Sequence, residues 1–214
     1  ISGQSIGDYE LLEGLGTISG GRGWTALNRL TDQRVNLFFQ SFVGAAHRFE
    51  QLALQYQKYE DPGIHTILDF GVLGPGEAWV VEIPIEGVNL TGQLRERGHP
   101  PIHVALDLVT SVARIVARAH HSGLNHGNLS TDVVVWQDGM LKLRALGFTS
   151  FTDERRTIHF ARDLAAIKDL LVQTIPNPPA AIRAVLTTTP DNAQALVRAL
   201  ESCAGLPLDA QKGR

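Results

Sequence analysis

Two short segments of this sequence carry residues of the kinds that hold phosphate groups or metal ions. The first is the glycine-rich run 16–23, Gly-Thr-Ile-Ser-Gly-Gly-Arg-Gly, where glycine supplies turn conformations that other residues resist. Such a loop can cradle phosphate, or it can be only the turn of a hairpin. The second segment contains His120, His121 and His126. These histidines have no acidic or cysteine partner in a metal-ligand pattern, so we expect core or surface histidines and no metal site.

The overall composition excludes several classes of protein. The chain has 214 residues, with 19 lysines and arginines against 22 aspartates and glutamates, so its formal net charge is −3. This balance gives no basic field for binding a phosphate backbone, and nucleic acid is therefore not an expected partner. A hydrophobic share of 43% is typical of a globular protein with a buried core.

Cysteine content and hydropathy indicate where the protein works. The single cysteine, Cys203, has nothing to pair with inside the chain, which fits a reducing compartment. No apolar run approaches the roughly 20 residues of a membrane helix, so we predict a cytoplasmic protein without direct membrane insertion. The chain starts at Ile1 and stops abruptly after 212–214, and we expect it to be a fragment of a larger protein.

The first eighty residues have the pattern of strands with one helix among them. Apolar and β-branched runs predict five strands, at 9–15, 24–28, 35–39, 66–70 and 79–83. One amphipathic helix interrupts them, because apolar residues recur at spacings of three and four between Phe49 and Tyr59. We interpret the run Asp69-Phe70-Gly71 as a strand end and turn.

From residue 101 onward the pattern changes to helices. A long core helix is predicted over 101–123, between a proline start and a glycine stop. Further helices are predicted around 164–171, over 180–186 and over 193–200. An Asp-Gly turn between apolar runs predicts a second hairpin over 133–143.

Together these elements predict an α+β fold in two lobes. The β-rich N-lobe, at 1–83, has a five-stranded sheet and one helix. A hinge at 84–90 joins it to a shortened helical C-lobe at 91–214. We treat the whole chain as one domain.

The order of these signals resembles the protein kinase family over nearly the whole chain, and in particular bacterial serine/threonine kinases. Gly16 and Gly21 fall where the first and third glycines of the family's G-x-G-x-x-G loop belong. The other matching segments are the first strand at 9–16, 35–38 in place of V-A-I-K, 61–64 in place of H-P-N-I, the hinge entry at 80–82, 120–129 in place of the run into H-R-D, 142–147 in place of the strand ending in D-F-G, and the buried helix start at 160–164. The resemblance implies a bilobal, protein kinase-like fold with a truncated C-lobe.

The resemblance also implies where the groups for phosphoryl transfer belong, and this sequence replaces them. The strand lysine corresponds to Phe38, its helix glutamate partner to Leu52, the catalytic aspartate to Asn128, the catalytic-loop lysine to Ser130, the magnesium-binding asparagine to Val133 and the D-F-G aspartate to Ala145. An amide at the catalytic position cannot take the proton of a substrate hydroxyl. Asp132 alone is a poor magnesium site. We therefore predict an inactive pseudokinase that is not an enzyme, has no cofactor, and is not expected to bind ATP or magnesium.

Other positions of the family's nucleotide site are partly kept. Gly16 and Gly21 remain of the phosphate loop, and Glu82 and Pro84 lie in the hinge. Proline has no N–H to give to an adenine edge, and because the hinge is about one residue longer than usual, Ile85 is the alternative donor. Weak, metal-free binding of ATP or ADP stays open as an alternative.

Further residues match the family at positions that serve its architecture. His126 and Asp163 correspond to the histidine of H-R-D and to the aspartate that begins the buried helix, which tie the loop backbone to the core. Asp163 is then a buried acid satisfied by backbone donors, because an unpaired one is costly. Leu146 replaces the D-F-G phenylalanine and is expected to stack with His126 and Tyr56 between the lobes.

The predicted function is regulation or scaffolding, by binding protein partners within a signalling assembly. The segment after Gly147 is short and lacks an A-P-E motif, and Thr149, Thr152 and Thr157 lie where family members are phosphorylated. The first alternative is a degenerate nucleotide sensor, in which the bound nucleotide biases lobe closure. The second is a residual serine/threonine protein kinase that uses displaced residues.

Overall fold

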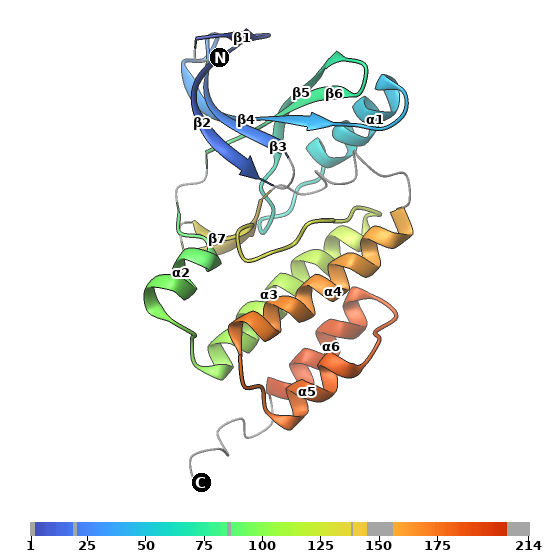
Figure 1. Ribbon diagram of the computed structural model, residues 1–214. Helices are drawn as coiled ribbons and strands as arrows, with labels where there is room; N and C mark the ends of the chain where they lie inside the picture. Colours follow the sequence, from blue (N-terminus) through green and yellow to red (C-terminus); the bar gives the residue numbers. More distant parts are fainter. Residues whose placement is uncertain (1–2, 19–20, 85–86, 138, 145–155, 205–214) are drawn as a thin grey trace.

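The strand-rich part of the molecule is a six-stranded antiparallel sheet (Figure 1). The computed structural model describes residues 3–18, 21–84, 87–137, 139–144 and 156–204. The strands are β1 (Ser5–Ile6), β2 (Tyr9–Ile18), β3 (Gly21–Asn28), β4 (Gln33–Ser41), β5 (Ile67–Gly74) and β6 (Glu77–Glu82), in the order β1-β2-β3-β4-β6-β5. All five predicted strands are present. The two-residue β1 is an addition that is too short to leave a pattern in the sequence.

Both faces of the sheet carry buried apolar residues. Alternate residues of a strand point to opposite faces, and on β4 Val35 and Leu37 belong to a small outer core whereas Phe38 belongs to the main core. The outer core is made by buried Tyr9, Leu11, Ala26, Val35, Leu37 and Val81. The inner face of the sheet, which carries Phe38, therefore faces the helical part of the molecule.

The run Asp69-Phe70-Gly71 lies in the middle of β5, so its interpretation as a strand end and turn is wrong. The strand continues to Gly74 because the actual turn is made by Gly76, with a φ of 74°. The Tyr9 hydroxyl donates to Asp69 Oδ2 at 2.8 Å. A Cβ on Gly71 would lie 2.6 Å from the ring of Trp79, so this glycine is needed for close packing.

The helix α1 (Ala46–Gln57) packs against β5. Its buried residues are Phe49, Ala53 and Tyr56, and Leu52 is partly buried against the same core. The helix ends before Tyr59, the last member of the predicted apolar stripe.

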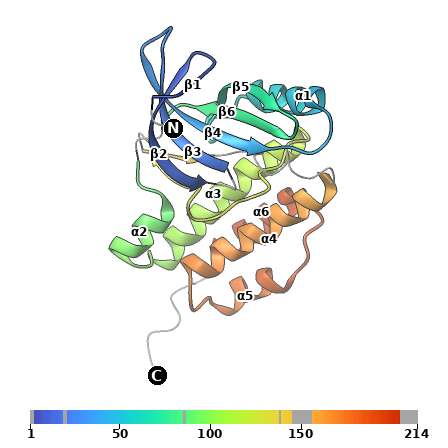
Figure 2. The same cartoon turned by 45° about the horizontal axis from the view of Figure 1, so that its top comes forward.

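The helical part is built around α3 (Ile102–His121), which agrees with the predicted core helix. The other helices are α2 (Leu90–Arg97), α4 (Arg156–Thr174), α5 (Ala180–Thr187) and α6 (Ala193–Ala204), and a hairpin is formed by β7 (Val134–Gln137) and β8 (Met140–Leu143). Helices α4 and α6 pack on α3, and α4 runs alongside it in both views (Figure 1, Figure 2). Within the described ranges, no helix is long and apolar enough to cross a membrane.

Helix α2 was not predicted from the sequence. Its eight residues include a single buried one, Leu90, so the segment has almost no apolar face. It is defined by its ends instead. The Asn89 side chain accepts a hydrogen bond from the Gly92 N–H at 2.8 Å, and Gly98 closes the helix with a φ of 74°.

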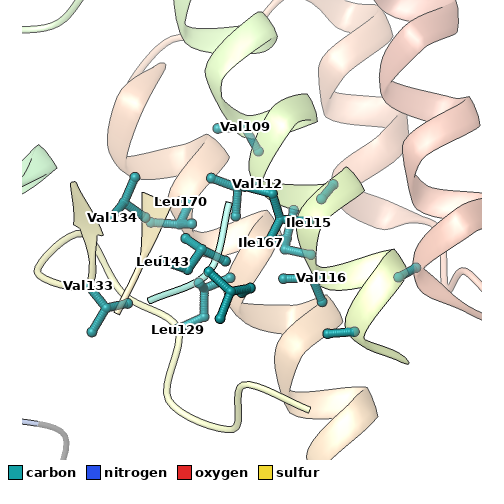
Figure 3. Packing of buried hydrophobic residues seen from close by; sticks show 14 of the residues in the cluster. Val109, Val112, Ile115, Val116, Leu129, Val133, Val134, Leu143, Ile167 and Leu170 are labelled. Carbon is teal, nitrogen blue, oxygen red and sulfur yellow. The ribbon is translucent and has the colours of Figure 1, made fainter. Parts of the chain in front are cut away.

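One hydrophobic core runs through both parts of the molecule. Figure 3 shows how residues of α3, α4 and the β7–β8 hairpin meet in it, among them Val112, Ile167 and Leu143. Phe38 and Val80 from the sheet belong to the same cluster. The two lobes are therefore packed against each other through apolar contacts.

An ion pair also joins the two parts. The guanidinium of Arg118 on α3 donates to both carboxylate oxygens of Asp61, at 2.5 and 2.8 Å. Although partial burial opposes the charge of Asp61, the hydrogen bonds from Arg118 and from the Gly63 N–H lower the pKa of its carboxyl. Asp61 lies on the loop between α1 and β5, so the pair fixes this loop to the helical part.

Replacing Arg118 with glutamine is expected to lower the free energy of unfolding by about 1–2 kcal/mol, because it leaves the nearly buried Asp61 carboxylate without its partner while half of the arginine is screened by water. Urea unfolding measures the loss. Arg114→Gln is the matched control. Arg114 lies one turn before Arg118 on the same face of α3, and it pairs with Glu201 of α6 through side chains that are both exposed. A greater loss for Arg114→Gln than for Arg118→Gln would contradict this prediction.

Candidate functional site

The glycine-rich run forms the end of the β2–β3 hairpin. Gly16 pairs with Gly23 and has a φ of 80°, a left-handed conformation that favours glycine. A Cβ on Gly21 would lie 2.1 Å from Gln40 Nε2, and one on Gly23 would lie 2.8 Å from Phe38 Cε1. The side chains of β4 thus occupy the space directly beneath these two glycines.

Phe38 is completely buried on the inner face of β4. It lies between Gly23 of β3 and Val80 of β6 in the register of the sheet. The guanidinium carbon of Arg144 lies 5.9 Å from the centre of the Phe38 ring, a distance at which a cation is attracted to the aromatic face. Arg144 was missed in the sequence, where it is one of many charged residues. Its alternation with Lys142 at the end of β8 is the signal that could have found it.

The corresponding position on α1 is apolar as well. Leu52 is partly buried and packs against the main core, whereas Glu50, the nearest acid in the sequence, is exposed. This places Glu50 on another side of the helix, as its two-residue offset predicts.

The loop before β7 carries the next group of predicted positions. Asn128 is exposed, and its backbone N–H donates to His126 Nδ1 at 3.4 Å. Ser130 is partly buried and accepts a hydrogen bond from the Val133 N–H through its backbone oxygen, at 3.2 Å. Val133 is only 1% exposed and packs beside the hairpin (Figure 3), while the neighbouring Asp132 is exposed.

Asp163 anchors this loop from beneath. Its carboxylate is fully buried and accepts the backbone N–H groups of His126 and Gly127, at 2.8 and 2.7 Å. His120 Nε2 lies 2.8 Å from the same carboxylate. Helix α4, which carries Asp163, is thereby joined to the end of α3 and to the loop that follows it.

His126 is also fully buried, and burial lowers the pKa of its ring. Its Nε2 lies 3.0 Å from the Arg144 carbonyl oxygen, which can only accept, so Nε2 carries the proton. Its Nδ1 then accepts from the Asn128 N–H. Tyr56 of α1 reaches this loop too, because its hydroxyl donates to the Asn125 carbonyl at 3.1 Å.

The remaining predicted positions lie at or beyond the edges of the described residues. Glu82, at the end of β6, is fully buried, and Pro84 is partly buried. Ile85 lies outside the described residues. The same holds for Ala145, Leu146, Thr149 and Thr152. Thr157 belongs to the first turn of α4.

His65 lies close to this region and is 6% exposed. Burial lowers the pKa of its ring to about 4; the Gln137 amide opposes this, and the charges of Lys142 and Arg144 add to it. The unfolded chain therefore takes up this proton first as the pH falls.

We expect His65 to have no effect on the free energy of unfolding above pH ~6.5. As the pH falls from ~6.5 to ~4, protonation of the unfolded chain should lower this free energy by up to roughly 3 kcal/mol. His65→Gln removes the titrating group and should flatten this part of the curve, as measured by urea unfolding at a series of pH values. His47→Gln, on the exposed surface of α1, is the control. An equal slope for wild type and His65→Gln would contradict this prediction.

Two surface cavities lie away from the predicted positions. One of about 680 Å³ lies between Asp61, Arg118 and Asn192. Another of about 360 Å³ lies over the outer face of the sheet, beside Trp24 and Phe39. Phe38, Asn128 and Val133 line neither of them.

Comparison with known proteins defines the class of this fold. The chain is similar to a crystal structure of Rad53 in complex with AMP-PNP, with a TM-score of 0.64 and 16% identity, over 89% of this chain and 52% of that one. The antiparallel sheet with its helix, followed by a helical lobe, is thus a protein kinase-like, α+β bilobal fold. No protein-family profile matches the chain.

The sequence relatives are bacterial. The chain is 26% identical to a probable serine/threonine-protein kinase of Clostridium perfringens over 168 residues, which cover 73% of this chain and 24% of the relative. It is also 26% identical to the serine/threonine-protein kinase PknA of Mycobacterium tuberculosis over 157 residues, which cover 69% of this chain and 36% of PknA. The chain therefore spans between about a quarter and just over a third of the length of these relatives, and its sequence is similar to bacterial serine/threonine-protein kinases.

These relatives overturn one prediction. The substitutions at Phe38, Asn128 and Val133 led us to expect a chain that is not an enzyme. The similar proteins are named serine/threonine-protein kinases, which points to an enzyme. Substitution of the expected residues does not exclude catalysis by others, because the groups of a catalytic site act together and their effects are not additive.

Proposed function

We propose that this chain is a regulatory, kinase-like domain of a signalling protein and that it acts by binding a protein partner. The observation that carries the proposal is the inner face of β4, where the fully buried Phe38 takes the position that the resemblance assigns to the phosphate-binding lysine. An apolar ring there contributes to the packing between the lobes. The side chain thus supports a fixed arrangement of the two lobes.

The network around Asp163 supports the same proposal. It holds the backbone of residues 126–127 and the end of α3 on one buried carboxylate. A fixed backbone offers a partner a surface that needs little ordering on binding, which favours recognition. Partner binding by a rigid kinase-like scaffold is consistent with these contacts.

The second candidate function is a serine/threonine protein kinase. The names of the sequence relatives favour it. In that case Asp132, exposed beside Val133, is the nearest acid for holding a cation or accepting a proton, and Arg144 supplies positive charge near Phe38.

One experiment on the full-length parent protein separates the two candidates. Transfer of labelled phosphate from ATP is measured for wild type, Asp132→Asn and the control Asp107→Asn, which changes an exposed acid of α3. Partner binding is followed in parallel by cross-linking and mass spectrometry. Under the proposed function both variants keep their partner cross-links to this domain. Phosphate transfer lost only in Asp132→Asn, with no partner cross-linked to the domain, would contradict the proposed function and support the kinase.

A further inference from the structure

The β7–β8 hairpin gathers polar and basic side chains on one face. Val135 lies opposite Lys142, and Gln137 lies opposite Met140 at the turn end of the hairpin. Arg144 follows the last residue of β8 at the other end, where its N–H donates to the Val133 oxygen at 3.0 Å. Because side chains alternate along a strand, Gln137, Lys142 and Arg144 share a face.

The segment 63–65 runs beside β8, to which it is joined by an isolated parallel bridge. Its Gly63 oxygen accepts the Leu143 N–H, and its His65 N–H donates to the Leu143 oxygen, both at 2.8 Å. Ile64 is paired in parallel with Leu143, so His65 points to the same face as Lys142 and Arg144. We call His65, Gln137, Lys142 and Arg144 the basic cluster.

Three buried polar atoms of the basic cluster have no hydrogen-bond partner among the described residues. They are His65 Nδ1, Gln137 Oε1 and Arg144 Nε. The Gln137 amide is close enough to oppose the lowering of the His65 pKa. Even so, neither His65 Nδ1 nor Gln137 Oε1 completes a hydrogen bond of normal geometry. Unsatisfied buried polar atoms are rare, and three of them along one face of this hairpin indicate a missing partner.

The cluster also carries uncompensated charge. Lys142 and Arg144 are both partly exposed, and neither forms an ion pair with a carboxylate in the part of the chain that the structure describes. His65 is neutral at pH 7 because its pKa is about 4. The cluster therefore has a net charge of two positive units, and one of its members, Arg144, lies over the ring of Phe38 of β4.

A fourth unpartnered atom lies further along the inner face of β4. Gln40 is two residues from Phe38 and 4% exposed, and its Nε2 has no hydrogen-bond partner among the described residues. This amide lies directly beneath Gly21, at the end of the glycine-rich hairpin. An elongated ligand that begins at the basic cluster would have a donor at this second point.

We propose that the basic cluster binds a phosphate group without a divalent metal ion, through Lys142 and Arg144. A phosphate group has a charge of about −1.5 to −2 at neutral pH, which matches the two fixed cations without a metal to neutralise it. The guanidinium is suited to phosphate oxygens by its planar set of donors. The inference deepens the proposed function and rests on it in one respect: the bound phosphate would be the ligand that regulates the domain.

The phosphate can belong to a nucleotide or be free inorganic phosphate, and binding is therefore measured for both. Calorimetric titration and thermal unfolding of the full-length protein are carried out in EDTA with inorganic phosphate, ADP and ATP as separate probes. A ligand that binds only the folded form raises the melting temperature. We expect at least one probe to raise it, and Arg144→Gln and Lys142→Gln each to weaken that probe's binding by about tenfold or more.

Matched controls change cations far from the cluster. Arg198→Gln on α6 and Lys58→Gln after α1 alter exposed side chains and should leave the affinity unchanged. Circular dichroism shows whether each variant is folded, and if Arg144→Gln is not, Lys142→Gln alone decides. No stabilisation by any probe at about 10 mM, where even a Kd near 1 mM would be detected, overturns the inference. Equal binding by the Lys142→Gln variant and its control overturns it as well.

A third variant distinguishes the two sources. If the ligand is a nucleotide, Gln40→Leu weakens ADP binding and leaves inorganic phosphate binding unchanged, and excess Mg²⁺ weakens ADP binding because the metal takes the phosphate charge. If the ligand is free phosphate, ADP binds no better than inorganic phosphate. Either pattern supports the inference. Partner cross-linking without added phosphate tests the proposed function separately, so either proposal can fail while the other stands.

Discussion

Replacing Asp163 with alanine is expected to lower the free energy of unfolding by roughly 3–5 kcal/mol, as measured by urea unfolding. The change removes the carboxylate that accepts two backbone N–H groups and contacts His120. These donors would then be buried without an acceptor, and each unsatisfied group costs about 1–3 kcal/mol.

The control for Asp163→Ala is Asp169→Ala on the same helix, because Asp169 is exposed. It should change the stability by less than about 0.5 kcal/mol. Asp163→Asn keeps one of the two acceptor positions and should lose less than Asp163→Ala. Equal stability of the Asp163→Ala and Asp169→Ala variants would show that the network does not hold the loop.

Phe38→Lys is expected to destabilise the protein by at least about 3 kcal/mol, because it removes a fully buried ring and places an ammonium group in its space. The nearby Arg144 guanidinium adds repulsion. Burial and this like charge lower the pKa of the new lysine in the folded state, so the unfolded chain binds the proton more tightly. The loss should therefore shrink as the pH rises towards ~10, which urea unfolding between neutral and alkaline pH can measure.

Phe38→Met is the control for the lost ring, because methionine fills much of the volume without a charge; its cost should be below that of the lysine variant and independent of pH. Gly23 offers a second check, since a Cβ there would meet the Phe38 ring at 2.8 Å. A Phe38→Lys variant as stable as Phe38→Met at neutral pH would show that this position accepts a charge.

Local patterns in the sequence were sufficient for most of the fold. The spacing of apolar residues predicted α3, and β-branched runs predicted the strands, because a helix or strand has to bury one face and its period appears in the chain. Helix α2 and strand β1 have almost no buried face, so they left no pattern. The order of the elements then indicated the kinase-like fold, which the comparison with solved structures confirms.

The candidate site was less accessible from sequence. The substitution at Phe38 could be named, but not that Gly23 and Gly21 make room for side chains of β4. The role of Asp163 could be predicted from sequence, because a buried carboxylate has to accept hydrogen bonds from nearby donors. The identity of one of those donors, His120, depends on the packing of α3 against α4.

The sequence by itself determined most of the strands and helices, because their periodicity appears along the chain, and the order of these elements indicated the kind of fold through its resemblance to a family. Only the tertiary structure decided that His65, Gln137, Lys142 and Arg144 lie on one face and that Arg144 lies beside Phe38. Their meeting depends on the register between segments almost eighty residues apart, and a shift of one residue would turn each side chain to the opposite face.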